Sequence, residues 1–316
     1  MVGRRSWERL FDLAAASGAA RGRFAGPRPI PQRPGLSFAF EGRTRTYRVH
    51  IPPSGRRDTA RPLVLALHGG GGTGFGMARI SHFSRVADRH GFLAVYPDGV
   101  DGSWADGRGV GPADLLGIDD VGFLSALLDA LAAEHAIDAA GIFAAGISNG
   151  GFLAQRLASD LPGRIAAVAS VGGTMPEHLA KSPPPATPVS VLFIHGTQDP
   201  MIPYEGGRVT GRSGRSSVLL SAPDSAAAWA ELVGCARDPI GSVRLPLAMD
   251  DGMSVTRVTY AGALGGAEVI LDIVVGGGHT WPGGIQYAPA RIIGQTKRDF
   301  DASEAIWEFF KTHRRS

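Results

Sequence analysis

Cysteine is almost absent from the 316-residue sequence, because Cys235 is the only one. A single thiol can form no disulfide within the chain and cannot build a zinc site from several cysteines. The sequence also lacks an apolar run of the ~18 residues that cross a bilayer. Its net charge of +3 is modest and is not accompanied by a basic stripe interleaved with aromatic residues. We therefore expect no membrane span and no nucleic-acid partner.

The first 35 residues differ in composition from the rest of the chain. Two arginines precede a short apolar stretch at 10–16, which Asp12 interrupts, and four prolines follow between residues 27 and 34. This pattern favours an amphipathic helix followed by a proline-rich linker, with a cleaved export signal as the alternative. We predict an N-terminal extension at 1–35 and a single catalytic domain at 36–316.

The remaining sequence alternates apolar runs with helical patterns, and glycine-rich turns follow the runs. Continuous apolar runs are typical of strands that are covered on both faces. This alternation predicts an α/β fold with a mainly parallel central sheet and helices on both faces. The expected core strands are 62–67, 92–97, 142–147, 165–171 and 189–194. A hairpin is expected at 36–41 and 45–51, a final strand pair at 255–260 and 269–275, and helices at 80–90, 121–135, 225–235 and 302–312.

A glycine-flanked serine follows one of these strands. The run 142–147 leads directly into Ser148, which lies between Gly146 and Gly150, and a helical stretch at 152–158 follows. Strand, G-x-S-x-G turn and helix form the context of a nucleophile elbow, in which the strained turn exposes the serine hydroxyl. The alternative is a turn of small residues without chemistry. The flanking elements favour Ser148 as a nucleophile.

A nucleophilic serine needs a histidine base, which is expected on a loop late in the chain. Of the nine histidines in the sequence, His195, His279 and His313 come after the next core strand. His313 lies near the C-terminus, and His195 lies close to the best carboxylate candidate. His279 follows a strand through three glycines, and we predict that it is the base.

An orienting carboxylate should lie on a loop between the serine and the histidine. Asp199 comes just after a buried strand, at the sheet edge where Ser148 is expected. Asp224 opens a helix and is better explained as its cap, whereas Asp272 lies inside a strand pattern. We predict Asp199 as the acid, with a simple turn residue before a proline as the alternative.

Two backbone amides should stabilise the oxyanion of an acyl-transfer reaction. One is the amide of Asn149, directly after the serine. The other should come from the glycine-rich loop 68–74, where Gly70 is the best donor and Gly69 and Gly71 are alternatives. A nucleotide site is disfavoured because the loop lacks the lysine of a phosphate-binding loop.

Three aromatic residues lie on loops that are expected at the catalytic edge: Trp104, Tyr204 and Trp281. They are candidates for the wall of a substrate pocket that receives an aromatic acyl group or a sugar face. Ordinary loop packing is the alternative. Trp281 is the strongest of the three candidates because it is two residues from His279.

Six motifs occur together in a fixed order, at 67–69, 96–99, 119–123, 146–151, 195–199 and 278–284. This set resembles the polyhydroxybutyrate-depolymerase and feruloyl-esterase group of α/β-hydrolases, in the first carbohydrate-esterase family, from about residue 36 onward. The resemblance implies a secreted or periplasmic serine esterase with a triad of Ser148, Asp199 and His279, although the N-terminus carries no convincing signal peptide. Gly70 stands where many extracellular depolymerases have a disulfide-bonded cysteine, and no dedicated polymer-binding domain follows. Both departures weigh against digestion of solid polyester.

We therefore predict a serine carboxylic-ester hydrolase that works through an acyl-enzyme, without a metal or organic cofactor. Feruloyl, other aryl or acetyl esters of plant polysaccharide are the expected substrates, either as small molecules or attached to a polymer. Hydrolysis of short-chain hydroxyalkanoate polyesters or oligomers is the alternative. A catalytically silent α/β-hydrolase that binds a ligand and a peptidase that uses the same triad are more distant alternatives.

Overall fold

A computed structural model describes residues 35–315, apart from 54–58, 162, 212 and 263–264. The predicted N-terminal extension, except for Gly35, therefore lies outside the described residues. No helix in the described part of the chain is both long and apolar enough to cross a membrane.

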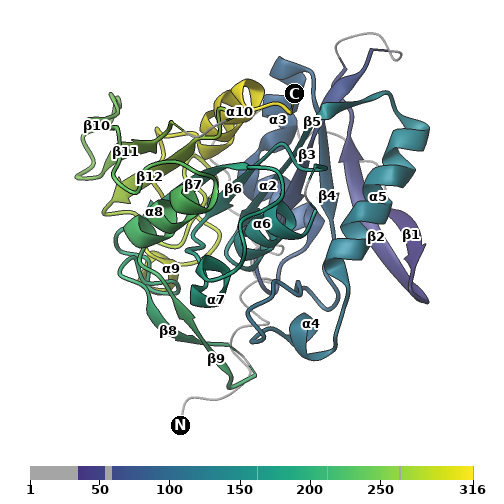
Figure 1. Cartoon of the computed structure of the whole chain (residues 1–316), viewed down its shortest axis with the longest axis horizontal. Helices are drawn as coiled ribbons and strands as arrows, with labels where there is room; N and C mark the ends of the chain where they lie inside the picture. Colours follow the sequence, from purple (N-terminus) through teal and green to yellow (C-terminus); the bar gives the residue numbers. More distant parts are fainter. Residues whose placement is uncertain (1–34, 54–58, 162, 212, 263–264, 316) are drawn as a thin grey trace, which may run out of the picture.

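A ten-stranded sheet forms the centre of the structure (Figure 1), in the order β1-β2-β4-β3-β5-β6-β7-β12-β11-β10. The strands from β4 to β12 in this order are parallel, and two antiparallel strands extend the sheet at each end. This arrangement confirms the mainly parallel sheet. Its strands are β1 (Leu36–Phe40), β2 (Arg43–His50), β3 (Arg61–Leu67), β4 (Leu93–Pro97), β5 (Ile137–Ile147), β6 (Ala167–Val171), β7 (Ser190–Gly196), β10 (Gly241–Arg244), β11 (Ser254–Tyr260) and β12 (Val269–Val275).

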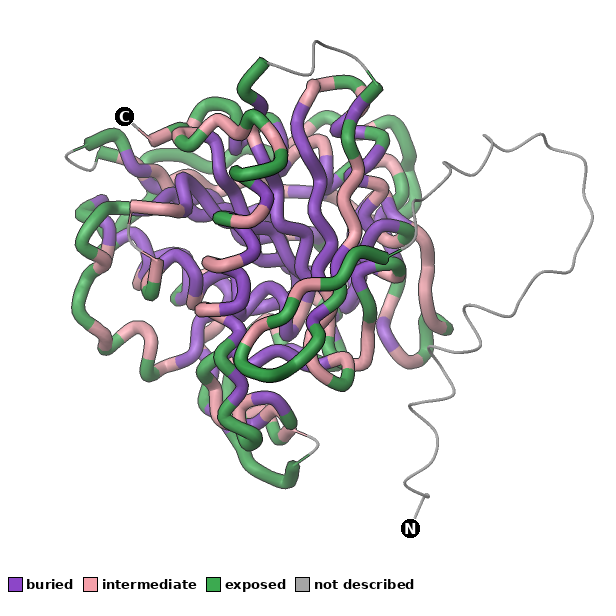
Figure 2. The backbone as a smooth tube through the Cα atoms, turned by 90° about the vertical axis from the view of Figure 1, so that its right-hand side faces the viewer, coloured by how far each residue is buried: buried purple, intermediate pink, exposed green. Residues whose placement is uncertain are grey.

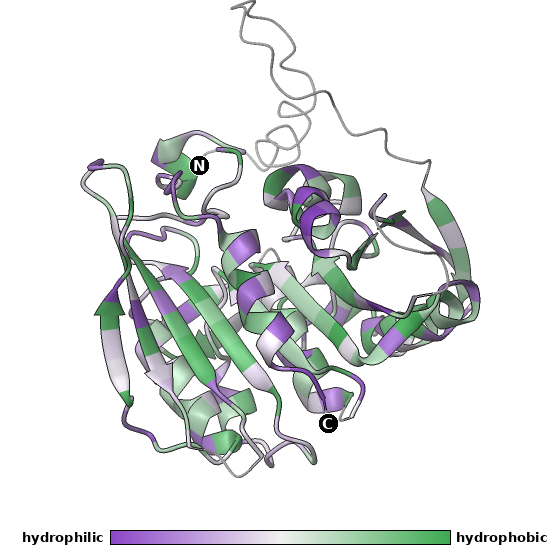
Figure 3. Ribbon diagram, turned by 90° about the horizontal axis from the view of Figure 1, so that it is seen from above, coloured by the Kyte–Doolittle hydropathy of each residue, from purple (hydrophilic) through white to green (hydrophobic). Residues whose placement is uncertain are grey.

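Helices cover both faces of the sheet, as predicted. The apolar side chains of α5 (Asp120–Glu134), α6 (Asn149–Asp160) and α8 (Ala222–Leu232) pack in one core. Those of α2 (Gly74–Ser81), α3 (Phe83–His90) and α10 (Ala302–Thr312) pack in the other. Figure 3 shows hydrophobic residues along the central strands and a mixture of hydrophobic and hydrophilic residues on the helices.

Strand β3 shows why helices must cover both faces of the sheet. Its leucines Leu63, Leu65 and Leu67 enter the core of α5, α6 and α8, while Val64 and Ala66 enter the opposite core. All five side chains are fully buried, and the central strands in Figure 2 are buried along most of their length. Such a strand reads as a continuous apolar run, which is why its position could be predicted.

Several short elements gather beyond the carboxyl ends of the parallel strands, at the bottom of Figure 1. They are α4 (Pro112–Leu115), α7 (Glu177–Ala180), α9 (Ala290–Ile293) and a two-stranded hairpin of β8 (Gly207–Thr210) and β9 (Ser216–Leu219). Each follows a different strand of the sheet. In open α/β sheets this edge is where ligands bind.

The structure differs from the expected elements in several places. The helix expected at 80–90 is two helices, α2 and α3, because His82 between them has a left-handed backbone with φ 57°. Helix α8 begins at Ala222 because the Ser221 side chain accepts from the Asp224 amide, so Ser221 and not Asp224 is the cap. The hairpin β8–β9 and strand β10 were not predicted, and β10 is exposed throughout and has no apolar run.

Candidate active site

The serine turn lies between β5 and α6. Strand β5 ends at Ile147, α6 begins at Asn149, and Ser148 between them has φ 54° and ψ −120°. A Cβ at Gly150 would lie 2.3 Å from the Leu67 carbonyl oxygen, and one at Gly146 would lie 2.3 Å from the Gly150 carbonyl. Both flanking positions therefore require glycine. The turn has the geometry expected of a nucleophile elbow.

The positive φ of Ser148 predicts an unusual effect on stability. We expect Ser148→Gly to be more stable than Ser148→Ala by about 1 to 2 kcal/mol, because glycine adopts this backbone conformation without a Cβ penalty. Urea unfolding of the two variants would measure the difference. In a matched pair at Ser182, a partly exposed position without positive φ, glycine should not be the more stable residue. A Ser148→Ala variant at least as stable as Ser148→Gly would contradict strain at this turn.

Asp199 and His279 form a buried hydrogen-bonded pair. Nδ1 of His279 donates to Oδ2 of Asp199 over 2.7 Å, and both side chains are almost fully buried. The other carboxylate oxygen accepts from the amides of Met201 and Ile202, both at 2.8 Å. Burial tends to raise the pKa of Asp199, but the charge of His279 and these hydrogen bonds outweigh it and lower the pKa. The carboxyl group is therefore ionised at neutral pH.

The loop that carries His279 is held by hydrogen bonds to the backbone of His279. The His279 amide donates to the Ile293 carbonyl, and its carbonyl accepts from the Tyr287 hydroxyl over 2.6 Å. Tyr287 was not singled out in the sequence, since its contact depends on the path of the loop between residues 279 and 294. These bonds fix the imidazole over Asp199.

Gly172 relates this pair to Ser148. The Ser148 amide donates to the carbonyl of Val171 over 2.8 Å. At the next residue, Gly172, an added Cβ would lie 3.1 Å from Nδ1 of His279 and 3.5 Å from Oδ2 of Asp199. The three predicted triad residues therefore gather around the end of β6, at the carboxyl edge of the sheet.

The alternative bases lie in other surroundings. His195 is buried, and its Nε2 donates to the Ile202 carbonyl over 2.9 Å while lying 3.7 Å from Oδ2 of Asp199. Burial lowers the pKa of His195, so it supports the Asp199 loop as a neutral ring. His313 follows the end of α10, where its ring contacts Phe309.

The alternative acids are also accounted for. Asp224 is exposed in the first turn of α8. Asp272 is buried in β12 and forms two 2.7 Å hydrogen bonds with the guanidinium of Arg257 on the neighbouring strand. Neither of these carboxylates is the one that contacts His279.

The glycine-rich loop lies beside the serine turn. An added Cβ at Gly69 would lie 3.5 Å from Cβ of Ser148, and one at Gly70 would lie 3.8 Å from Cβ of Asn149. Gly70 is exposed, whereas the Gly71 amide donates to the Gly102 carbonyl over 2.7 Å. Of the three predicted donors, Gly71 is thus already engaged.

Two of the three predicted pocket aromatics are in the core, so this prediction is wrong for them. Trp104 and Trp281 have no exposed surface. The Trp104 indole donates to the His68 carbonyl, and the Trp281 indole donates to the Ser303 hydroxyl and packs edge-on against Phe83. Sequence proximity to the site said nothing about which way these rings point. Tyr204 is partly buried beside the Asp199 loop, and it remains a candidate.

The burial of Trp281 leads to a prediction about stability. We expect Trp281→Ala to lower the free energy of unfolding by about 3 to 5 kcal/mol, because it leaves a large cavity. The ratio of rates on aryl and acetyl esters should change less than twofold. Urea unfolding and paired assays would test this, with Trp281→Phe as a milder control. A selective loss on aryl esters at unchanged stability would restore Trp281 to the pocket wall.

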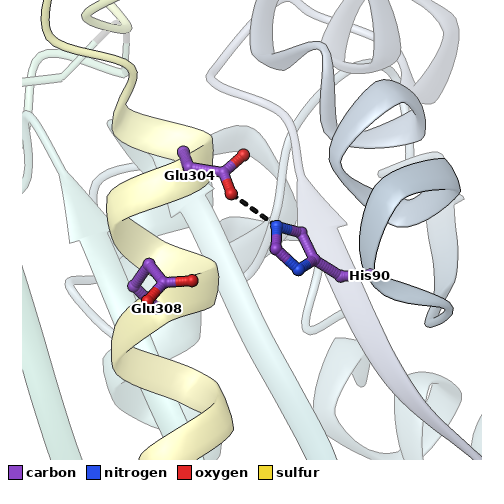
Figure 4. A group of neighbouring side chains, drawn as sticks. All are labelled: His90, Glu304 and Glu308. Atoms are coloured by element: carbon purple, nitrogen blue, oxygen red, sulfur yellow. Dashed lines mark hydrogen bonds and ion pairs between the residues drawn. The ribbon is translucent and has the colours of Figure 1, made fainter.

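One group in the described part of the chain has side chains suited to a metal ion: His90, Glu304 and Glu308 (Figure 4), whose ligand atoms lie within 4.8 Å of one another. His90 ends α3 just before β4, and so lies away from the carboxyl edge. Glu304 pairs with both His90 and Arg89, and Glu308 pairs with Lys311. We interpret the group as ion pairs, two of which join α3 to α10 and one of which lies within α10.

A parallel sheet covered by helices on both faces, with a glycine-flanked serine at the end of a central strand, defines the α/β-hydrolase class. The fold is shared with an acetyl xylan esterase from Aspergillus awamori, at a TM-score of 0.51 and 18% identity over 75% of this chain and 89% of that one.

Comparison with known sequences identifies the family. Residues 45–183 match the family model of the esterase PHB depolymerases. "Putative esterase NocK" of Nocardia uniformis subsp. tsuyamanensis is 34% identical, over 89% of this chain and 85% of NocK. Feruloyl esterase B of Piromyces equi is 26% identical, over 73% of this chain and 42% of its own length. The chain belongs to the PHB depolymerase and feruloyl esterase family of α/β-hydrolases, which confirms the resemblance, and it is a carboxylic ester hydrolase.

Proposed function

We propose that this esterase works by acyl transfer through Ser148, with His279 as the base and Asp199 as the orienting acid. The 2.7 Å bond from His279 to Asp199, at the sheet edge where Ser148 adopts its strained turn, is the observation that carries this proposal. A bond from Nδ1 to a carboxylate leaves Nε2 of the neutral ring free to accept the serine proton. The catalytic domain is assigned to residues 36–316.

The reaction takes place in two steps. Ser148 attacks the ester carbonyl while His279 takes its proton, and ionised Asp199 stabilises the imidazolium. The amides of Asn149 and Gly70 hold the oxyanion, an interaction worth about 3 kcal/mol per donor. His279 then protonates the departing alcohol, and water repeats the sequence on the acyl-enzyme to release the acid.

The substrates are proposed to be feruloyl, other aryl or acetyl esters of plant polysaccharide. The support comes from relatives described as feruloyl esterases and as an acetylxylan esterase/xylanase. Short hydroxyalkanoate esters are the second candidate, because the matching family model is that of PHB depolymerases. Tyr204, partly buried near Asp199, is the remaining aromatic candidate for contact with the acyl group.

Three experiments test this function. An organophosphonate should label Ser148 covalently, whereas a protein that only binds a ligand would stay unmodified. Steady-state kcat/KM values on methyl ferulate, acetylated xylan, a hydroxybutyrate oligomer and short nitrophenyl esters should rank the aryl or acetyl esters first. A matched anilide should be hydrolysed far more slowly than its ester. Preference for the oligomer would select the second candidate, and rapid anilide cleavage would indicate a peptidase.

A further inference from the structure

The side chain of Asn149 has a defined set of buried partners that the proposed reaction does not use. Its Oδ1 accepts from the Trp104 amide at 2.8 Å, and its Nδ2 donates to the Trp104 carbonyl at 3.0 Å and to Oδ2 of Asp106 at 2.5 Å. An N–H can only donate and a carboxylate can only accept, so these contacts allow one orientation of the amide. The side chain is thus clamped to the loop that follows β4.

This clamp acts on the residue whose backbone amide is the proposed oxyanion donor. Asn149 is the first residue of α6, and the first amides of a helix have no partner within the helix. The amide's direction therefore depends on how the residue is held at its Cα. Because three hydrogen bonds fix the Asn149 side chain, they also restrict rotation of its backbone and so the direction of the amide.

Asp106 is itself held in place. Nε and Nη2 of Arg108 donate to its Oδ2 at 3.0 and 2.6 Å, and the Arg108 guanidinium lies 3.7 Å from the ring centre of Phe152 in α6. Asp106 is buried, with 3% of its surface exposed. Its negative charge is compensated by Arg108, which also packs against α6, the helix that follows Ser148. Asp106 therefore presents a fixed acceptor to Asn149.

The same loop is also linked, through His68, to the peptide that carries the other proposed amide. Nε2 of His68 accepts from the Gly99 amide at 2.9 Å, so its Nδ1 carries the proton and donates to the Gly69 carbonyl at 2.8 Å. Burial lowers the pKa of His68 to about 4, which keeps this ring neutral near pH 7. The loop thus binds Asn149 directly, and through His68 it holds the carbonyl of the Gly69–Gly70 peptide.

We propose that Asp106 is a positioning residue, which aligns the backbone amide of Asn149 with the oxyanion by holding the Asn149 side chain. The inference rests on the proposed function of Ser148 and Asn149. The proposal assigns this role to Asp106 and not to Asp114. Asp114 accepts from the amides of Gly107 and Gly111 in the same loop and is not among the partners of Asn149 described above.

A double-mutant cycle tests the proposal. Asn149→Ala keeps the backbone amide but loses the clamp, and Asp106→Ala loses its anchor. Each should lower kcat about tenfold, a fraction of the effect of a missing donor, with KM changed less than twofold. The double variant should be no slower than Asn149→Ala. Asp114→Ala should keep kcat within about twofold, and Asp106→Asn, which retains an oxygen acceptor, should recover most of the loss.

The affinity for an arylboronic acid separates positioning from general loosening. Its adduct with Ser148 places an oxygen in the oxyanion hole, so its Ki should rise in proportion to the loss in kcat. Additive losses in the cycle, an equal loss in Asp114→Ala, or full kcat in folded Asn149→Ala would overturn the proposal. Full kcat in folded Asn149→Ala would overturn the positioning role of Asp106 even if Asp106→Ala does not fold. If Ser148 is not labelled by an organophosphonate, the proposed function fails instead.

Discussion

Ser148→Ala is expected to lower kcat on every ester substrate by about 10⁴- to 10⁶-fold, because it removes the only atom that forms the acyl-enzyme in the proposed reaction. The remaining rate would come from substrate binding and the oxyanion amides. The fold should persist, because alanine keeps the Cβ and the backbone bonds of Ser148 to Val171 and Phe152. Steady-state kinetics and circular dichroism would measure both effects.

The matched control for this variant is Ser182→Ala, at a partly exposed serine whose hydroxyl donates to the His178 carbonyl. It should retain the wild-type rate and be labelled by an organophosphonate like the wild type. Turnover of Ser148→Ala within about tenfold of the wild type would refute the nucleophile assignment, as would labelling that persists in that variant.

Asp199→Asn should lower kcat by about 10⁴-fold while changing the structure little. The asparagine oxygen can still accept from the amides of Met201 and Ile202, and this directs its NH₂ group toward Nδ1 of His279. Nδ1 must then accept a hydrogen bond, so the ring proton moves to Nε2. A ring protonated on Nε2 cannot take the proton from Ser148, and the base is lost.

Asp224→Asn provides the comparison, because Asp224 was an alternative acid in the sequence and is exposed in the structure. It should change kcat less than twofold. Kinetics at pH 7 for both variants, with nitrogen chemical shifts of the His279 ring, would test the tautomer argument. An Asp199→Asn variant that keeps more than a tenth of the wild-type kcat would exclude Asp199 as the orienting acid.

Much of the fold was predictable because its signals are local. Strands such as β3 and β5 are covered on both faces, so each reads as an apolar run in the sequence. Helix α10 has the bounds predicted for it, and Ile306, Phe309 and Phe310 are buried on its inner face. By contrast, the break between α2 and α3 depends on the left-handed backbone of the single residue His82. The periodicity of apolar residues in the sequence does not indicate such a break.

The sequence by itself determined the order of the core strands and the main helices, the glycine-flanked turn at Ser148 and a short set of candidate acids and bases. These follow from apolar periodicity and from positions where only glycine fits. The sequence also proposed Asp199 and His279 as partners, but only the tertiary structure brings them into contact, 80 residues apart. The contact of Asp106 with Asn149, 43 residues apart, was decided by the tertiary structure alone. The tertiary structure also turned Trp104 and Trp281 into the core. Such contacts depend on how loops from different strands pack at one edge, and no local pattern encodes that packing.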